Sequence, residues 1–257
     1  MITSAQNSKI KLIRALLGRA KERREANAFV VEGVRLVEEA VISNWELRFV
    51  LYDESLSDRG RSQIESLNLR GIETEMVSES LMKSLSETDT PQGILAVLEF
   101  TNLPIPRSPT FLLIPDQIRD PGNLGTLLRS AAAAGVQAVL IPPETTDAFA
   151  PKVVRSGMGA HFRLPIRSMT WNELRGQTKE LQIYLADMDG KSCWETDLRQ
   201  PLSLVIGGEA EGASEEARRL ANQKISIPMS RDIESLNAGV AGSVLMFEVV
   251  RQRKSIE

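Results

Sequence analysis

The alternation of apolar and polar positions is clearest in the middle of the chain. An apolar run at 111–114 predicts a buried strand, and a second run at 138–141 predicts another. Between them, residues 116–124 form a polar loop with Pro-Gly, and helical spacing over 126–134 predicts a helix that ends at Gly135. This order defines a βαβ unit, and its polar loop follows the carboxyl end of a strand, where open α/β sheets bind ligands.

The second half of the chain continues this alternation. Apolar runs predict further strands at 162–166, 183–186, 202–206 and 224–227, and helical spacing predicts helices at 151–157, 171–181 and 237–253. Strands separated by helices favour a largely parallel sheet with helices on both faces.

The first half alternates in the same way over about 100 residues, which is a normal size for a domain. The predicted helices lie at 9–24, 34–42, 62–69 and 79–85, and the predicted strands at 29–32, 47–52, 73–77 and 94–98. Three prolines within 101–110 indicate a semi-rigid linker. We therefore predict two domains, at 1–103 and 108–257.

Two more loops with unusual residues follow predicted strands. Gly207 and Gly208 permit positive φ and close approach of the backbone to a ligand. The last helix contains Gly239 and Gly242, and a glycine inside a helix costs about 1 kcal/mol relative to alanine. These glycines predict that another backbone passes against the helix. In a parallel sheet, all three loops can lie on the same edge.

Each loop taken alone also has a simple structural interpretation. Asp120, Asn123 and Arg129 bring polar groups together, but Asn123 is equally a helix cap and Arg129 a solvated side chain. For the second loop taken alone, a glycine turn with solvated Glu209 and Glu211 is the simpler interpretation. A single motif of this kind is a weak signal, so both interpretations stay open at this point.

The net charge of the whole chain is small, but its first residues carry an excess of positive charge. The 257 residues carry a net charge of -3, with 42% hydrophobic and 25% charged residues, as expected of a soluble globular protein. Residues 1–24, however, set seven basic side chains against Glu22 alone. They are Lys9, Lys11, Arg14, Arg19, Lys21, Arg23 and Arg24. A solvated helix face and a contact with RNA explain this surplus equally well.

Several kinds of chemistry are disfavoured by what the sequence lacks. Cys193 is the only cysteine and His161 the only histidine, so we expect no disulfide and no metal site, and we interpret both residues as structural. The phosphate-loop pattern GxxxxGK and the dinucleotide pattern GxGxxG do not occur. No apolar run is long enough to span a membrane, and a lone cysteine fits a reducing cytoplasm, where we expect the protein to be.

The three loops together resemble the three motifs of the SpoU (TrmH-type) RNA 2′-O-ribose methyltransferases, within the SPOUT superfamily. The matching positions are Asn123, Gly125 and Arg129 for the first motif, IGGEAEG at 206–212 for the second, and IPM at 227–229 followed by SLN at 235–237 for the third. The first half resembles the substrate-binding domain often fused in front of these enzymes, notably in FVVEGVRLVEEA and TPQGILAV. The resemblance therefore covers nearly the whole chain.

This resemblance implies a fold, a reaction and partners. The fold would be a trefoil-knotted α/β domain with a mostly parallel sheet, behind a smaller N-terminal α/β substrate-binding domain. The protein would be a homodimer that transfers a methyl group from S-adenosyl-L-methionine to a ribose 2′-hydroxyl of RNA. Members with the added front domain act mostly on large-subunit ribosomal RNA (rRNA), so we expect that substrate, with transfer RNA as the alternative.

The resemblance also assigns the site. The residues that would surround the reacting hydroxyl are Asn123, Arg129, Glu209, Ser235 and Asn237. The residues whose backbone groups would surround the cofactor are Gly207, Gly208, Ile227, Met229 and Leu236. The resemblance implies that Arg129 abstracts the proton of the hydroxyl. A guanidinium, however, is effectively always protonated. We expect Arg129 to bind the neighbouring phosphate and the developing alkoxide, while a phosphate oxygen, Glu209 or water takes the proton.

Two other classes of protein are alternative hypotheses. The first is an RNA-binding factor on the same fold without catalysis, and the joint presence of all the residues expected around the hydroxyl argues against it. The second is a small-molecule or nucleotide-binding α/β enzyme, which the missing phosphate loops and the basic first helix disfavour.

Overall fold

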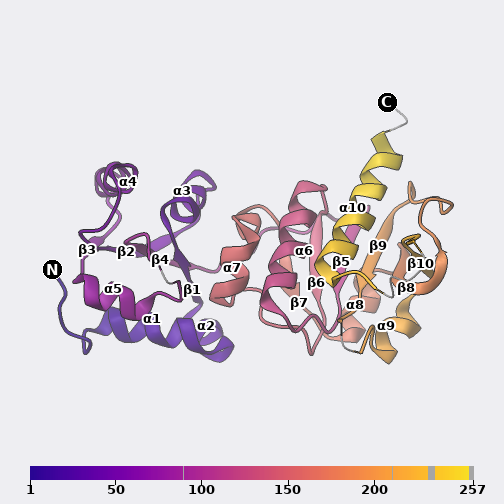
Figure 1. Cartoon of the computed structure of the whole chain (residues 1–257), viewed down its shortest axis with the longest axis horizontal. Helices are drawn as coiled ribbons and strands as arrows, with labels where there is room; N and C mark the ends of the chain where they lie inside the picture. The colour runs from indigo at the N-terminus through magenta and orange to yellow at the C-terminus, as the bar shows by residue number, and fades with distance from the viewer. Residues whose placement is uncertain (89, 210, 231–234, 255–257) are drawn as a thin grey trace. The chain divides into compact units, whose positions relative to one another are not determined.

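The computed structural model describes residues 1–88, 90–209, 211–230 and 235–254, and these form two compact units (Figure 1). The first unit is Met1–Asn102 together with Phe149–Arg155, and the second is Leu103–Ala148 together with the described chain from Ser156 onwards. A short segment of the second half of the sequence thus belongs to the first unit. The domain bounds drawn from the sequence stay a prediction.

The first unit contains a four-stranded mixed sheet in the order β1-β4-β2-β3. Strand β4 runs antiparallel to both of its neighbours, whereas β2 and β3 are parallel. The strands are β1 (Ala28–Glu32), β2 (Leu47–Tyr52), β3 (Thr74–Met76) and β4 (Ile94–Glu99). The helices are α1 (Ser8–Gly18), α2 (Ala20–Ala26), α3 (Val34–Ile42), α4 (Asp58–Leu69) and α5 (Glu79–Leu85).

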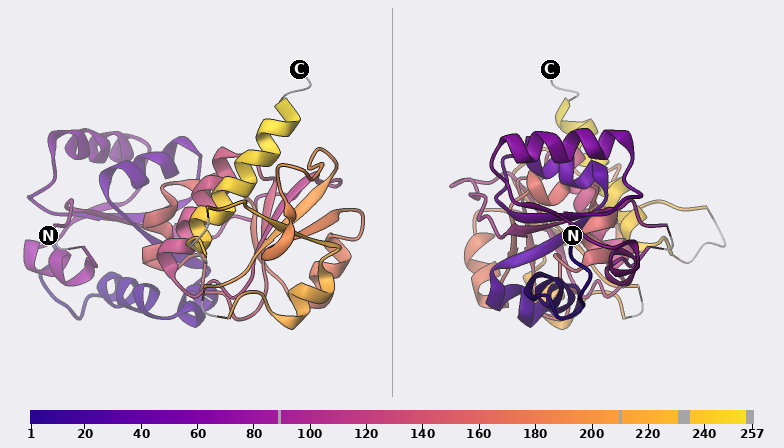
Figure 2. Two further views of the ribbon diagram at one scale, coloured as in Figure 1. Left: turned by 45° about the vertical axis from the view of Figure 1, so that its right-hand side comes forward. Right: turned by 90° about the vertical axis from the view of Figure 1, so that its left-hand side faces the viewer.

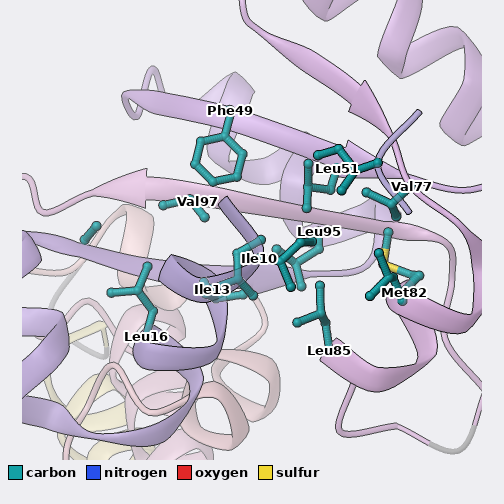
Figure 3. Close-up of a cluster of buried hydrophobic side chains, with 14 residues drawn as sticks. Ile10, Ile13, Leu16, Phe49, Leu51, Val77, Met82, Leu85, Leu95 and Val97 are labelled. Atoms are coloured by element: carbon teal, nitrogen blue, oxygen red, sulfur yellow. The ribbon is translucent and has the colours of Figure 1, made fainter. Parts of the chain in front are cut away.

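One core of this unit lies between the sheet and helices α1 and α5, as Figure 3 shows. Ile10, Ile13 and Leu16 of α1 are fully buried there, and they meet Leu51 and Leu95 of the sheet. Burying a leucine or isoleucine side chain stabilises a fold by about 1.5–3 kcal/mol. The apolar face predicted for the first helix is therefore confirmed as part of a core.

The single helix predicted at 9–24 is wrong, because the chain forms two helices with a break at Arg19, which is extended (φ -116, ψ 140). Beyond the break, Arg23 turns inward and its Nη1 donates to the Leu16 carbonyl oxygen over 2.5 Å. Lys9 is held by Glu73 and Glu75 at 2.7 and 2.6 Å. The basic side chains that remain exposed are Lys11, Arg14, Arg19, Lys21 and Arg24.

The second unit contains a six-stranded sheet in the order β10-β8-β9-β5-β6-β7, and every neighbouring pair is parallel. The strands are β5 (Phe111–Pro115), β6 (Ala138–Ile141), β7 (Ile166–Ser168), β8 (Gln182–Ser192), β9 (Leu202–Ile206) and β10 (Gln223–Ser226). The helices are α6 (Pro121–Ala133), α8 (Trp171–Gln177), α9 (Glu215–Leu220), α10 (Ala238–Lys254) and the 3-10 turn η1 (Ala160–Phe162). Helix α7 (Pro151–Gly157) lies mostly in the first unit, and only its last two residues belong to the second. The parallel sheet predicted from the alternation is confirmed.

Helices cover both faces of this sheet. Helices α6 and α10 pack side by side on one face (Figure 2), whereas Leu174 of α8 and Ala217 of α9 are buried in a core on the other face. The glycines of α10 meet side chains of α6, not a backbone as predicted. A Cβ on Gly242 would lie 2.3 Å from Leu127 Cδ2, so the absence of a side chain lets the two helices approach closely.

Two further predicted elements differ in the structure. Helix α6 begins at Pro121 and not at 126, because Asp120 caps it and proline suits the first helical position. The strand predicted at 162–166 is instead the η1 turn followed by β7, since Gly159 at φ +87 starts a tight turn. The other predicted elements are present, although several begin or end at different residues. The trefoil knot stays a prediction.

Among the described helices, none combines the length and the apolar character that a membrane span requires.

Candidate active site

Three loops of the second unit meet at the carboxyl edge of the parallel sheet. They connect β5 to α6, β9 to α9, and β10 to α10, and β5 and β9 are hydrogen-bonded neighbours. Side chains from all three loops are joined by hydrogen bonds. The expectation that these loops share one sheet edge is thereby confirmed.

The first loop ends in a helix start that leaves Asn123 free for other contacts. Asp120 Oδ1 accepts a hydrogen bond from the backbone N–H of Asn123 over 2.8 Å and caps α6. Asn123 is therefore not the cap that the sequence allowed. It lies in the first turn of the helix, and its amide reaches the second loop.

Glu209 is the acceptor around which the three loops meet. Its Oε1 accepts hydrogen bonds from Asn123 Nδ2 at 2.8 Å, from Asn237 Nδ2 at 2.6 Å and from the backbone N–H of Ala238 at 3.2 Å. Asn237 Nδ2 also donates to Asn123 Oδ1 over 2.9 Å. We call Asn123, Glu209 and Asn237 the Glu209 cluster. Such a closed network holds all its members in one arrangement.

Asn237 also starts helix α10. Its Oδ1 accepts from the backbone N–H of Val240 over 3.2 Å, and its carbonyl oxygen accepts from Ala241. One side chain thus satisfies the helix start with its oxygen and binds Glu209 with its nitrogen. The orientation of the amide in the cluster follows from this capping bond.

A cavity of about 240 Å³ opens beside the cluster. Asn123, Glu209 and Ala238 line it together with the acidic side chains of Asp120 and Glu211. Arg119 is the one basic residue among the described residues that line it. Its Nη2 lies 3.7 Å from Glu211 Oε2 and 4.0 Å from Glu144 Oε2. These long, exposed pairs cost little to break, so Arg119 is free to meet an anion.

The structure explains why glycine stands at Gly125 and Gly208 of the first two motifs, which the sequence alone did not. A Cβ on Gly125 would lie 1.8 Å from Ser156 Oγ, so this glycine lets α6 approach the end of α7. A Cβ on Gly208 would lie 2.4 Å from the carbonyl oxygen of Gln117, which belongs to the first loop. These glycines allow segments of the protein's own chain to pack closely.

Arg129 and Ser235 are not brought into the Glu209 cluster. Both are exposed, and neither side chain makes a hydrogen bond or ion pair with any residue that the structure describes. Arg129 lies further along α6 and does not line the cavity.

The residues expected around the cofactor fall into two groups. Gly208 lines the cavity, whereas Gly207, Ile227, Met229 and Leu236 do not. The last three are half-buried and follow β10. Within the described ranges, their backbone groups make no hydrogen bond.

His161 and Cys193 lie apart from the cluster. His161 is buried and its Nε2 contacts the Ala148 carbonyl oxygen at 2.7 Å. Burial lowers the pKa of His161 from 6.5 to about 4, against the opposing effects of this bond and of Asp147. Burial likewise raises the pKa of the Cys193 thiol, so neither residue is poised for chemistry at neutral pH.

Sequence reasoning missed two residues of this edge, Asp116 and Arg119. Asp116 is fully buried directly after the apolar run of β5. A charged residue placed without a break after such a run is the signal that could have drawn attention to it. Arg119 has no comparable signal, because its role depends on carboxylates that are distant in sequence.

The fold and the cluster define an α/β domain with its site at the carboxyl ends of parallel strands, preceded by a smaller mixed-sheet unit. Comparison with known proteins identifies the family to which this pair of domains belongs. The model of the SpoU rRNA Methylase family matches residues 110–247, and that of the MRM3-like substrate binding domain matches residues 7–96. The chain belongs to the SpoU rRNA methylase family.

Two relatives are similar over more than nine tenths of their own length. The chain is 33% identical to the 23S rRNA (guanosine(2553)-2'-O)-methyltransferase RlmP of Bacillus subtilis, over 96% of this chain and 98% of the relative. It is 32% identical to the 23S rRNA (uridine(2479)-2'-O)-methyltransferase of Streptomyces viridochromogenes, over 98% and 92%. The crystal structure of the SpoU methyltransferase AviRb from that organism, in complex with the cofactor AdoMet, superposes with a TM-score of 0.83 at 31% identity, covering 97% of this chain and 100% of that chain.

Proposed function

We propose that this protein transfers the methyl group of S-adenosylmethionine to a ribose 2′-hydroxyl of RNA, with large-subunit rRNA as the substrate. The observation that carries this proposal is the Glu209 cluster, in which three loops distant in sequence hold one carboxylate beside a cavity. The relatives named for 2′-O-methylation of 23S rRNA, at 33% and 32% identity, support the choice of reaction and substrate.

The reaction requires positioning and the removal of a proton. When bound, the cofactor supplies a methyl group that is already electrophilic on its sulfonium. The protein must therefore hold the hydroxyl oxygen in line with that methyl group and accept its proton. Asn123 and Asn237 fix the carboxylate of Glu209 on the cavity side of the sheet edge, so they act by orientation.

Glu209 has one oxygen left for the substrate. Its Oε1 already accepts three N–H groups, while Oε2 makes no hydrogen bond with the described residues. We assign Oε2 the hydrogen bond from the ribose hydroxyl, and with it the proton or its passage to water. Arg129 and Ser235 complete the set around the hydroxyl, and Arg129 binds the neighbouring phosphate and the developing alkoxide.

The residues assigned to the cofactor fit a ligand of this kind. Half-buried side chains of Ile227, Met229 and Leu236 offer apolar surface for the adenine ring. Their backbone N–H and C=O groups have no hydrogen-bond partner among the described residues, and such groups require partners when they are covered. Gly207 and Gly208 let the backbone of the second loop approach a ligand bound beside these residues. These residues would hold the cofactor.

RNA binding extends to the first unit in this proposal. The exposed basic side chains of α1, α2 and the break between them attract phosphates through charge, without sequence preference. They are Lys11, Arg14, Arg19, Lys21 and Arg24. The match to a substrate-binding domain over residues 7–96 supports this role.

The protein acts as a homodimer in this proposal, and the contact is the outer face of α10. Val240, Val244 and Phe247 are 47%, 37% and 48% exposed at helical spacing, so they form one apolar stripe. Helix α10 packs against α6 through Thr126 and Gly239 and through Ser130 and Ser243. A second copy of this chain would cover the stripe. In this proposal the protein acts in the cytoplasm, and the lone Cys193 suits a reducing compartment.

The experiment that tests the function is methyl transfer with the purified protein. Radiolabelled S-adenosylmethionine is incubated with rRNA from cells that lack the protein, and the product is digested to nucleosides. The proposal predicts that the label appears in one 2′-O-methylated nucleoside. Label on a base would contradict the acceptor, and RNA binding without transfer would favour a non-catalytic RNA-binding factor.

A further inference from the structure

Asp116 is a fully buried carboxyl group next to the candidate site. It follows β5 directly and its side chain is 0% exposed. It does not line the cavity, and its hydrogen bonds go to Ser214 and Ile206 and not to the Glu209 cluster. Its position therefore suits an action through other residues.

Asp116 holds both ends of the second loop. Its backbone N–H donates to the carbonyl oxygen of Ile206, the last residue of β9, over 2.9 Å. Its side-chain Oδ2 accepts from the backbone N–H of Ser214 over 2.6 Å. Ser214 is the residue that caps α9. Both ends of the loop between Ile206 and Ser214 are thus bound to a single residue, which directly follows the neighbouring strand β5.

The same loop is braced inside its ends. The backbone N–H of Gly208 donates to the Gly212 carbonyl oxygen over 3.1 Å, so these two residues form an antiparallel bridge. Gly208 also lies against Gln117, the residue after Asp116. Gly208, the residue before Glu209, is thus held by Gly212 and by the residue that follows Asp116. The position of Asp116 therefore influences where Glu209 lies.

Holding the loop in this way has a cost in stability. Asp116 Oδ1 is buried and has no hydrogen-bond partner in the described part of the chain. Burial raises the pKa of Asp116, although the bonds from Ser214 oppose this effect. A buried acceptor without a partner is unfavourable and calls for an explanation. Stability alone does not explain this carboxyl group.

We propose that Asp116 is a positioning residue, which fixes the 206–214 loop so that Gly208 and Glu209 lie where the cofactor and the ribose hydroxyl require them. This inference rests on the proposed function, because that loop is the one assigned to the cofactor. It predicts that loss of the Asp116 side chain raises the cofactor Kd by more than a general loss of stability, measured as a lower Tm, would explain.

The test compares three variants of the full-length protein. Asp116→Ala removes the bond to Ser214, and Asp116→Asn keeps an oxygen that can accept it. Thr170→Ala removes the side-chain cap of α8 in the same unit and leaves Asp116 and Ser214 unchanged, so it is the matched control for general loss of stability. The readouts are the Kd for S-adenosylmethionine by calorimetry, kcat and KM for rRNA, and Tm.

We expect Asp116→Ala to raise the cofactor Kd at least tenfold with little change in KM for RNA. Asp116→Asn should stay within about threefold of the parent, as should Thr170→Ala despite a lower Tm, because Thr170 caps a helix outside the 206–214 loop. If Asp116→Ala does not fold, Asp116→Ser, whose shorter side chain does not reach Ser214, takes its place.

Two results would overturn the inference while leaving the proposed function intact. The first is parental cofactor affinity in the Asp116→Ala protein. The second is an equal loss of affinity in Asp116→Ala and Thr170→Ala, which would assign Asp116 to the fold alone. A parent protein that does not bind S-adenosylmethionine would instead overturn the proposed function, and the inference with it.

Discussion

Asn123 donates a hydrogen bond from its amide to Glu209 Oε1 over 2.8 Å, although the two residues lie 86 positions apart in the sequence. Adjacent parallel strands β5 and β9 bring them to the same sheet edge, and the cap provided by Asp120 places Asn123 in the first turn of α6. Each residue alone is compatible with an ordinary surface role. Together with Asn237 they form a polar cluster next to a cavity.

Arg129 should require the planar fork of arginine. Arg129→Lys keeps the charge but cannot bind a phosphate through two parallel N–H groups. We expect kcat to fall by roughly tenfold or more for lysine and roughly a hundredfold for alanine, in line with the loss of one group that stabilises a developing oxyanion. Single-turnover methyl transfer measures both. Arg175→Lys, at an exposed arginine on α8, is the control. Parental rates for Arg129→Lys would exclude a role for the fork.

The basic face of the first unit should contribute to RNA affinity through charge. Deleting residues 1–24 would not isolate this effect, because Ile10, Ile13 and Leu16 belong to a core. The combined change of Lys11, Arg14 and Arg19 to alanine leaves that core intact.

This triple variant should bind RNA more weakly. The plot of log association constant against log salt concentration should also become shallower, its slope falling in magnitude by up to about 2, since each phosphate contact contributes about 0.7 on single-stranded RNA. Cofactor affinity should stay at the parental value. A triple variant of the exposed residues Arg61, Arg70 and Lys83 controls for net charge. An equal effect of both triples would remove the special role of this face.

The stability of the second unit should depend on pH through His161. Its pKa is about 4 in the folded protein and 6.5 ordinarily, so the unfolded chain binds a proton between these values that the folded protein does not. Stability from this residue is complete above pH 6.5 and is lost as the pH falls towards 4. The loss amounts to about 3 kcal/mol.

Denaturant unfolding of the parent and of His161→Gln at pH 7 and pH 5 measures this effect. Glutamine can still donate to the Ala148 carbonyl oxygen but does not titrate. We expect the variant to lose less stability than the parent between the two pH values. Equal losses would show that other groups govern the acid response.

The apolar stripe on α10 should control association. Phe247→Glu places a charge in the proposed contact on both copies, and burying each phenylalanine contributes about 1.5–3 kcal/mol. The dimer should therefore weaken by roughly a hundredfold or more. Sedimentation equilibrium measures this change. Met188→Glu, at a methionine that is 65% exposed on β8, is the control. A parent protein that is monomeric at micromolar concentration would contradict the proposal.

Much of the fold could be predicted from the sequence, because apolar runs and helical spacing determine element type locally. The predictions failed where a tertiary or capping interaction sets the boundary. Arg19 breaks the first helix so that Arg23 can bind the Leu16 carbonyl oxygen, and the Asp120 cap starts α6 early. Gly242 accommodates a side chain of the neighbouring helix, which no pattern within α10 could reveal.

The residues of the site could be predicted only in part. Resemblance to the family supplied Asn123, Glu209 and Asn237, and the structure brings these three together. It leaves Arg129 and Ser235 outside the cluster, and their roles stay a prediction. Asp116 could not be assigned, because its partners are the carbonyl oxygen of Ile206 and the N–H of Ser214, and only the pairing of β5 with β9 places them next to it.

The most direct test of the central claim is a map of 2′-O-methylated nucleotides in rRNA. Cells that lack the protein are complemented with the parent, with Glu209→Gln, or with Glu215→Gln, a change at an exposed glutamate of α9. The account predicts one large-subunit site that is lost without the protein, restored by the parent and by Glu215→Gln, and not restored by Glu209→Gln. Identical maps with and without the protein would contradict it.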